Sequence, residues 1–219
     1  MRPNSTASAT PRRSWRQARG VRTREVILRK AVDIASVQGL EGLTVGTLAN
    51  ALGMSKSGLF GHFGSKRVLQ LATVDAARQI FIDSVIKPSL TAPKGMPRLW
   101  RLVDRWIAHV ENHVFSGGCF FTAASFEFDS RRGPVRDRIA AVMREWMGTL
   151  TRAVHAAQKE GHIPATVDPA GLAQELQSYA LGAHWATQLL EDRAAYAGAR
   201  VLALQRLRSL ATANSPRVG

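Results

Sequence analysis

The residues with the clearest capacity for chemistry are two histidines and a cysteine near the middle of the chain. His109 and His113 are four residues apart in a segment with helical periodicity, and Cys119 follows them. Two histidines at that spacing on one helix face can hold zinc. The intervening glutamate is one place later than in the His-Glu-x-x-His motif, and no further ligand is identifiable. We therefore expect no metal, and we interpret the histidines as pocket-lining or surface side chains and Cys119 as a small buried one.

Sequence motifs of enzymes are absent. The chain contains no Gly-x-Ser-x-Gly, no Walker loop, no Gly-x-Gly-x-x-Gly and no clustered pair of carboxylates on a plausible scaffold. It also contains no run of the roughly 18 apolar residues that a membrane span requires, and no secretory signal. A single cysteine is typical of a reducing compartment. We expect a cytoplasmic protein that is not an enzyme, needs no cofactor and does not bind membranes.

Basic charge is the strongest signal of the overall composition. The chain has 30 Lys and Arg against 16 Asp and Glu, a net charge of +14. Residues 1–24 hold arginines at positions 2, 12, 13, 16, 19, 22 and 24 and no acidic residue. Such a distribution indicates binding to a polyanion, although a solubilising tail is an alternative. Residues 1–19 have almost nothing to bury, so we expect a disordered basic arm.

The remainder of the sequence is helical in pattern, and the fold class that it predicts is all-α. Apolar residues recur at helical spacing, and Gly and Pro residues separate the segments. We expect an N-terminal head over residues 20–68 and a helical body over residues 69–213. The predicted helices span residues 21–38, 45–52, 56–62, 66–86, 97–114, 119–129, 134–160, 169–190 and 192–212.

Residues 43–63 predict a helix-turn-helix, two short helices around a turn glycine. Ala49 precedes Gly53 by four residues, where a small side chain lets the helices cross, and Leu59 follows as an apolar anchor. Ser55 caps the second helix and leaves Lys56 and the residues after it at the exposed N-terminal end. A recognition helix presents that end to base edges in the DNA major groove.

The segment from residue 23 to residue 72 resembles the tetracycline-repressor family of DNA-binding regulators. The resemblance rests on the string GLEGLTVGTLANALGMSKSGLFGHFGSK, in which a helix-turn-helix runs into a small-aromatic-x-His-Phe element and a Ser-Lys helix start. It implies that a major groove is faced by Lys56, Ser57, Gly58 and Gly61. It also implies that the phosphate backbone is approached by Thr44, Phe60, His62 and Lys66. Thr44 and Ser55 carry hydroxyls that can reach phosphate or cap their helices.

Two departures from the family pattern affect how this chain would read DNA. Phe60 stands where tyrosine is usual and cannot donate a hydrogen bond to phosphate. Gly46 and Gly61 stand where other members often have side chains that reach DNA, and each weakens its helix by roughly 0.5–1 kcal/mol relative to Ala. We therefore expect few direct base contacts. Operator preference would lean on the arginine arm in a minor groove and on DNA shape.

Aromatic and other large apolar residues are concentrated between residues 97 and 160, where the family houses a pocket for a small-molecule effector. Core packing explains most of them individually, but pockets for drug-sized ligands are lined this way. The expected pocket residues are Trp100, Trp106, His109, His113, Phe120, Phe126, Met143, Trp146 and Trp185. A bulky, mainly apolar inducer is predicted.

The last two predicted helices indicate how the chain would dimerise. A very short turn joins them, so they must be antiparallel neighbours. Leu172, Leu176, Tyr179 and Ala183 form one apolar stripe, and Leu181, Trp185 and Leu189 form a second. A helix that is apolar on two sides needs two partners, and a second copy of this hairpin is the simplest second one. The sequence thus predicts a homodimeric repressor that a ligand releases from a palindromic double-stranded DNA operator. A constitutive nucleic-acid-binding protein without an inducer is the alternative.

Overall fold

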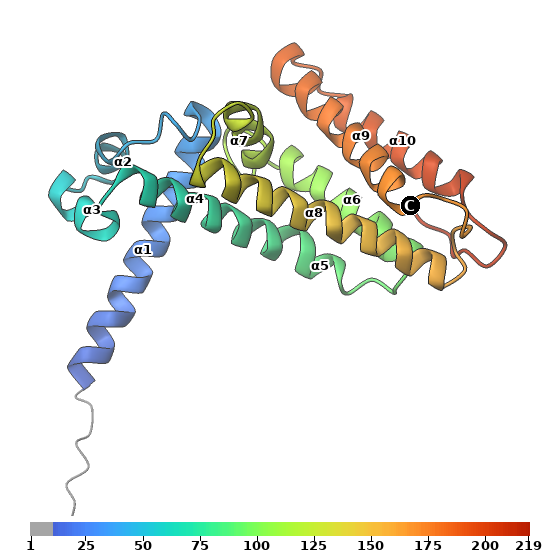
Figure 1. Ribbon diagram of the computed structural model, residues 1–219, viewed down its shortest axis with the longest axis horizontal. Coiled ribbons are helices and arrows are strands. Elements are labelled where there is room, and N and C mark those ends of the chain that lie inside the picture. Colours follow the sequence, from blue (N-terminus) through green and yellow to red (C-terminus); the bar gives the residue numbers. More distant parts are fainter. Residues whose placement is uncertain (1–10) are drawn as a thin grey trace, which may run out of the picture.

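The computed structural model describes residues 11–219, and within that range every regular element is a helix. A head of α1 (Pro11–Gln38), α2 (Val45–Leu52) and α3 (Lys56–Phe63) is joined by α4 to a longer helical body (Figure 1). The prediction of an all-α protein with a three-helix head is confirmed. None of the helices in the described range is long and apolar enough to cross a membrane.

Helix α1 begins earlier than the sequence pattern predicted. It starts at Pro11, so the expectation of a disordered arm is corrected for residues 11–19, which are helical; residues 1–10 lie outside the described range. Proline is favoured in the first turn of a helix, where its missing N–H is not needed. The Arg, Gln and Ala residues that follow it have high helix propensity. A lack of apolar residues predicts that a segment does not pack against a hydrophobic core. Such a segment can still be helical.

Side-chain caps set the starts of the next three helices, as the sequence predicted. Thr44, Ser55 and Ser65 each accept the N–H of the residue three places later, at 3.0, 3.1 and 3.2 Å. Each cap satisfies a backbone donor that the helix leaves free and is typically worth about 1 kcal/mol. The helix boundaries in the head therefore follow from local chemistry alone.

The helical path that begins at Lys66 continues through Pro88 to Ser89, whereas the sequence predicted that this helix ends at residue 86. α4 (Lys66–Phe81) passes into a π-helical segment, η1 (Ile82–Ile86), and then into the short α5 (Lys87–Ser89). In the π-helical segment the N–H of Lys87 bonds to the carbonyl of Ile82, five residues earlier. This wider turn accommodates the proline ring, and the helical path continues through it.

The body consists of α6 (Met96–Glu111), α7 (Phe120–Phe128), α8 (Pro134–Lys159), α9 (Pro169–Leu190) and α10 (Ala195–Ser209). α8 contacts α4, α6, α7 and α9, while α7 also contacts α1 of the head. α9 and α10 form an antiparallel hairpin at one edge (Figure 1). α10 is shorter at each end than predicted. At its start, Asp192 Oδ1 accepts the N–H of Ala194 at 2.9 Å, which makes residues 191–194 a turn.

Helix α6 ends three residues earlier than predicted, and this changes the interpretation of the histidine pair. His113 has a φ of 49° and lies in the turn after α6, with its side chain exposed. His109 is buried within α6. The expectation that both rings share one helix face is therefore wrong, because the helix ends between them.

Candidate functional site

The helix-turn-helix has the geometry that its residues predicted. Gly53 takes a φ of 63°, a left-handed conformation that favours glycine, and ends α2. The N–H of Met54 then bonds to the carbonyl of Ala49 at 3.0 Å. The Ala49 and Leu59 side chains are fully buried where α2 and α3 meet. These contacts fix the angle at which α3 leaves the turn.

The N-terminal end of α3 is open to solvent. Lys56, Ser57 and Gly58 are all exposed. The Lys56 side chain extends across α2, where a Cβ added to Gly46 would lie 3.6 Å from its Cε. Gly46 thus leaves room for Lys56 to lie against the neighbouring helix. The structure places a flexible cation and a serine hydroxyl at the end of the helix where groove recognition is expected.

The cap residues Thr44 and Ser55 are already engaged within the protein. Thr44 and Thr47 form a capping box, since Thr47 Oγ1 also accepts the N–H of Thr44 at 3.0 Å. Ser55 Oγ accepts the N–H of Gly58 and lies 3.3 Å from Ser57 Oγ. Both residues remain exposed, so capping and a contact to phosphate are compatible.

Phe60, Gly61 and His62, at the later positions of α3, differ in exposure and in hydrogen-bonding capacity. Phe60 is 53% exposed, which is unusual for a phenylalanine in a well-packed head. Gly61 is exposed, and a Cβ added to it would meet open space. The His62 side chain is half-buried. Phe60 and Gly61 therefore offer no hydrogen-bonding side chain at these later positions of α3.

Arg24 stabilises the head by contacts with the end of α3, which its place among the N-terminal arginines did not predict. Its Nη1 donates to the carbonyl of His62 at 2.7 Å, and its guanidinium lies 4.5 Å from the centre of the Phe63 ring. A cation is favourable at the C-terminal end of a helix, where carbonyl groups lack partners. This arginine thus stabilises the end of α3.

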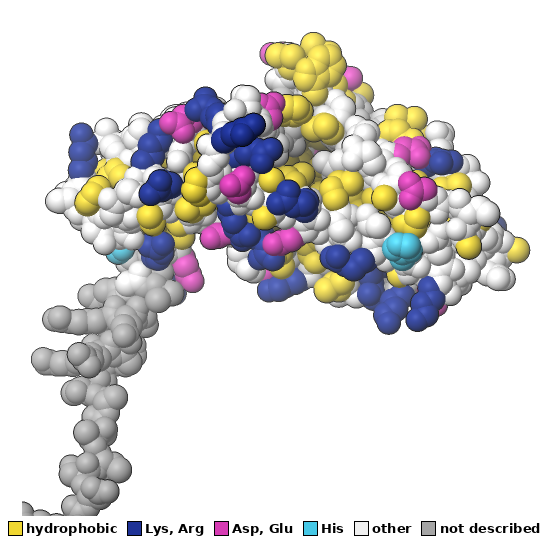
Figure 2. Space-filling view, in the orientation of Figure 1, with side chains coloured by type: hydrophobic (Ala, Val, Ile, Leu, Met, Phe, Trp, Pro, Cys, Tyr) yellow, Lys and Arg dark blue, Asp and Glu magenta, His cyan; other side chains and the backbone are white. Residues whose placement is uncertain are grey.

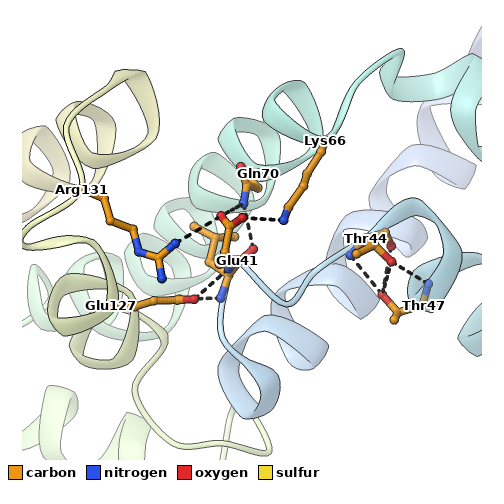
Figure 3. Close-up of polar contacts among 8 residues, drawn as sticks. Glu41, Thr44, Thr47, Lys66, Gln70, Glu127 and Arg131 are labelled. Carbon is orange, nitrogen blue, oxygen red and sulfur yellow. Dashed lines mark hydrogen bonds and ion pairs between the residues drawn. The ribbon is translucent and has the colours of Figure 1, made fainter.

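Lys66 is held by Glu41 in a cluster that joins the head to the body (Figure 3). Its Nζ donates to Glu41 Oε1 at 2.7 Å, while Gln70 Nε2 donates to Glu41 Oε2 at 3.1 Å. From the other side, the Glu127 carboxylate of α7 accepts the N–H groups of Leu40 and Glu41 at 2.7 and 2.9 Å. The turn between α1 and α2 is therefore fastened to both α4 and α7.

Two acidic side chains of the head are engaged within the protein, whereas two of its exposed cations are not. Glu41 and Asp33 both face neighbours within the protein, and hydrogen bonds from Lys66 and from Ser116 respectively are the main cause that lowers their pKa values. Lys56 and Arg67 are exposed and form no ion pair among the described residues. Figure 2 shows Lys and Arg side chains distributed over this end of the molecule. Lys56 and Arg67 are thus free to meet a polyanion.

A small apolar cavity of about 30 Å³ lies inside the body. Of the predicted pocket residues, Trp106, Met143 and Trp146 line it. The other wall residues are Phe81, Cys119, Phe121, Thr122, Val142 and Gln177. Phe81 was not predicted because it lies on α4, outside residues 97–160, where the aromatic residues are concentrated. Gln177 was not predicted because it is polar and lies among the apolar residues of α9. A polar residue at a buried position of an apolar helix face is the signal that could have identified it.

Trp146 and His109, two polar side chains at or beside this cavity, have hydrogen-bond partners within the protein. Trp146 Nε1 donates to Gln177 Oε1 at 2.8 Å. His109 is 5% exposed, with Nδ1 at 2.8 Å from Ser84 Oγ, and desolvation by burial followed by the nearby Arg29 charge lowers its pKa to about 4. Ser84 Oγ donates to the Ile80 carbonyl, so the neutral His109 ring donates to Ser84.

Besides His109 and His113, four of the predicted pocket residues lie away from the cavity wall. Phe120 is buried beside it, stacked edge-on against Phe115 and Phe121, and Trp100 is half-buried against the core. Phe126 and Trp185 are 64% and 57% exposed. With Leu189 they line an open apolar hollow of about 610 Å³ between α7 and α9. Sequence periodicity could not assign them because exposed and buried apolar positions have the same spacing.

Comparisons with known proteins agree with this arrangement. The model for "Bacterial regulatory proteins, tetR family" matches residues 27–73, and "Tetracyclin repressor-like, C-terminal domain" matches residues 95–202. A TetR transcriptional regulator from Chloroflexus aurantiacus has a TM-score of 0.81 and 25% identity, with 89% of this chain and 98% of that chain covered. A TetR-family regulator from Cytophaga hutchinsonii has a TM-score of 0.76 and 17% identity over 89% and 97%. No curated protein matches in sequence.

A further solved structure is of AibR in complex with isovaleryl coenzyme A and operator DNA. It has a TM-score of 0.64 and 22% identity, and the match covers 82% of this chain and 97% of that chain. At this identity the likeness is one of fold.

Proposed function

Because the chain belongs to the tetracycline-repressor family of DNA-binding transcriptional regulators, we propose that it is a dimeric repressor released from a palindromic operator by a small, largely apolar ligand. It would act in the cytoplasm, where that operator is. AibR, a protein of the same fold, has been solved with both a small molecule and operator DNA.

The observation that carries the proposal is that α4 belongs to both functional regions. Its first residue, Lys66, bonds to the head at Glu41, and its last, Phe81, is a wall of the body cavity. A helix of this length spans about 24 Å. A ligand that displaces Phe81 would shift α4 and thereby change the separation of the two recognition helices in a dimer.

Helix α7 provides a second connection between cavity and head. Phe121 and Thr122 line the cavity near the start of α7, and Glu127 near its end holds the N–H groups of Leu40 and Glu41. Both connections end on the same turn between α1 and α2. Movement of either helix would therefore reach the head at one place.

The exposed apolar face of the α9–α10 hairpin supports dimerisation there. Leu172 and Leu176 of the first predicted stripe are buried against the body, while Leu189 of the second is 66% exposed. Val201 and Leu202 of α10 are also exposed. Figure 2 shows hydrophobic side chains gathered at the end of this hairpin. An exposed apolar face of this kind is typical of an interface.

The test of the DNA-binding part begins with footprinting on DNA upstream of the protein's own gene. We expect two half-sites about 34–36 Å apart. Lys56→Ala should weaken binding to that site far more than binding to random duplex. Lys66→Ala should weaken both equally and flatten the salt dependence, because we expect Lys66 to exchange Glu41 for a phosphate when DNA binds. Equal losses on both DNAs for Lys56→Ala would show that Lys56 contacts only the backbone.

The test of the ligand-response part uses linkage. A ligand that releases operator must bind more weakly in the presence of operator, by the same factor. We expect a coupling of about 5–150-fold when a ligand that quenches tryptophan fluorescence is titrated with and without operator. Identical dissociation constants would contradict ligand-controlled repression.

The size of the cavity favours a second candidate function, constitutive DNA binding without an inducer. Ligand sites commonly measure about 300–1,000 Å³, and the cavity of about 30 Å³ is far smaller. Release by ligand therefore requires the wall to open. Operator binding that no small molecule in a broad screen weakens would support the constitutive alternative.

A further inference from the structure

A groove on the outside of the body shares its floor with the interior cavity. It runs between α4–η1 and α8 and has a volume of about 410 Å³. Phe81, Val142 and Trp146 line both the groove and the cavity, so these three side chains border the two spaces at once. The remaining groove residues are Arg78, Ile82, Ile86, Glu145, Thr149 and Arg152.

One wall of the groove contains the π-helical segment. Ile82 and Ile86 begin and end η1, and both line the groove. π-Helical turns are rare and occur frequently at functional sites. Together with Phe81 and Trp146 they make an apolar surface, which can accept the hydrocarbon part of a ligand.

The charged groups of the groove are unequally paired. Arg78 Nε donates to Glu145 Oε2 at 2.6 Å, an ion pair that bridges α4 and α8. Arg152 has no acidic partner among the described residues, and its one hydrogen bond there is from Nη2 to Thr149 Oγ1 at 3.0 Å. The Thr149 hydroxyl itself donates to the carbonyl of Glu145, so it accepts from the arginine. Most donors of the Arg152 guanidinium are therefore available to a ligand.

Gly148 leaves room for the Arg152 side chain to lie along its own helix. A Cβ added to Gly148 would lie 3.1 Å from Arg152 Nη1, so the guanidinium rests over the position that a side chain would otherwise occupy. Thr149 and Gly148 thus orient the cation along α8. A carboxylate matches the planar donor pattern of a guanidinium better than any neutral group does.

We propose that this groove binds a small amphipathic monoanion, with its acidic group on Arg152 and its apolar part over Ile82, Ile86 and Trp146. Displacement of Phe81 and Trp146 would let the apolar part enter the interior cavity, which joins the two spaces into one ligand-sized site. The inference deepens the proposed function, because it names the chemical class of the effector, and its regulatory consequence rests on that function.

The experiment compares three eight-carbon probes that differ in charge: octanoate, 1-octanol and octylamine. Binding to the full-length protein is measured by calorimetry and by quenching of tryptophan fluorescence. We expect octanoate to bind about tenfold more tightly than 1-octanol, as a charge-assisted hydrogen bond implies, and octylamine to bind most weakly. Arg152→Ala should abolish the preference for octanoate and leave 1-octanol binding unchanged, while Arg152→Lys should keep part of it.

Arg144→Ala is the matched control. Arg144 is an exposed arginine of the same helix, it does not line the groove, and its loss changes the net charge equally. Octanoate binding that equals that of 1-octanol, or falls equally in the Arg152→Ala and Arg144→Ala variants, overturns the inference, as does the absence of binding by all three probes. Operator release is measured separately. Octanoate that binds through Arg152 without releasing operator upholds the site and shows that its occupancy by octanoate does not control operator binding.

Discussion

His109 illustrates how burial changes the chemistry of a single residue. An unfolded histidine takes up a proton near pH 6.5, whereas desolvation lowers the pKa of His109 to about 4 in the folded protein. Between these values the unfolded state binds more protons, so stability falls as the pH is lowered. We expect a loss of about 2 kcal/mol from this residue between pH 7 and pH 5.

The measurement is urea unfolding at both pH values for the native protein and for His109→Gln. The variant should lose about 2 kcal/mol less than the native protein over this range. Some dependence should remain, since burial also lowers the pKa of His184. An equal pH dependence in the two proteins would show that the folded protein protonates His109 between pH 7 and pH 5, as the unfolded chain does.

Two glycines of the head should respond oppositely to the same substitution. Gly61 has open space around its Cβ position and no left-handed backbone, so Gly61→Ala should stabilise by about 0.5–1 kcal/mol. Gly53 has a φ of 63°, so Gly53→Ala should destabilise by about 1–2 kcal/mol. Thermal denaturation checks both. A stabilised Gly53→Ala variant would be incompatible with the observed turn.

At the scale of elements, Glu127 of α7 fastens the body to the head through two backbone N–H groups (Figure 3). Gln can accept only one of these bonds in the same geometry, because its second terminal atom is a donor. Glu127→Gln should therefore lower stability by about 1–3 kcal/mol and reduce operator affinity. Denaturation and DNA titration measure the two effects.

Asp129→Asn is the control for Glu127→Gln. Asp129 follows α7, is exposed and forms no hydrogen bond or ion pair among the described residues. Its substitution alters the net charge by the same amount. Similar effects from both variants would mean that charge, and not the contact with Leu40 and Glu41, is responsible.

At the scale of the whole molecule, the exposed hairpin face should control assembly. Leu202→Glu and Leu189→Glu each place a charge on that face, where burial in an interface would leave it unpaired. Both variants should sediment as monomers in analytical ultracentrifugation at concentrations where the native protein is a dimer. Leu90→Glu, on an equally exposed leucine after α5, should remain dimeric. Monomers from all three would indicate general destabilisation.

Local signals in the sequence were sufficient to place each helix approximately and to identify the helix-turn-helix of the head. Caps at Thr44, Ser55 and Ser65, the turn at Gly53 and the apolar spacing each act within a few residues, so they can be identified without knowledge of the fold. The motif around residues 43–63 likewise predicted the exposed end of α3. The start of α1 and the passage through Pro88 were predicted wrongly, because a segment without apolar residues can still be helical and because a π-helical turn accommodates a proline.

Only the tertiary structure decided which side chains meet. Phe81 and Trp146 are 65 positions apart in the chain and become one wall, while Phe126 and Trp185 share the apolar character of core residues and lie at the surface. Periodicity reports that a helix has an apolar face, and packing determines what that face contacts. For the same reason, no local pattern predicts that Lys66 and Glu127 both hydrogen-bond to the turn between α1 and α2, because the three segments are far apart in the sequence.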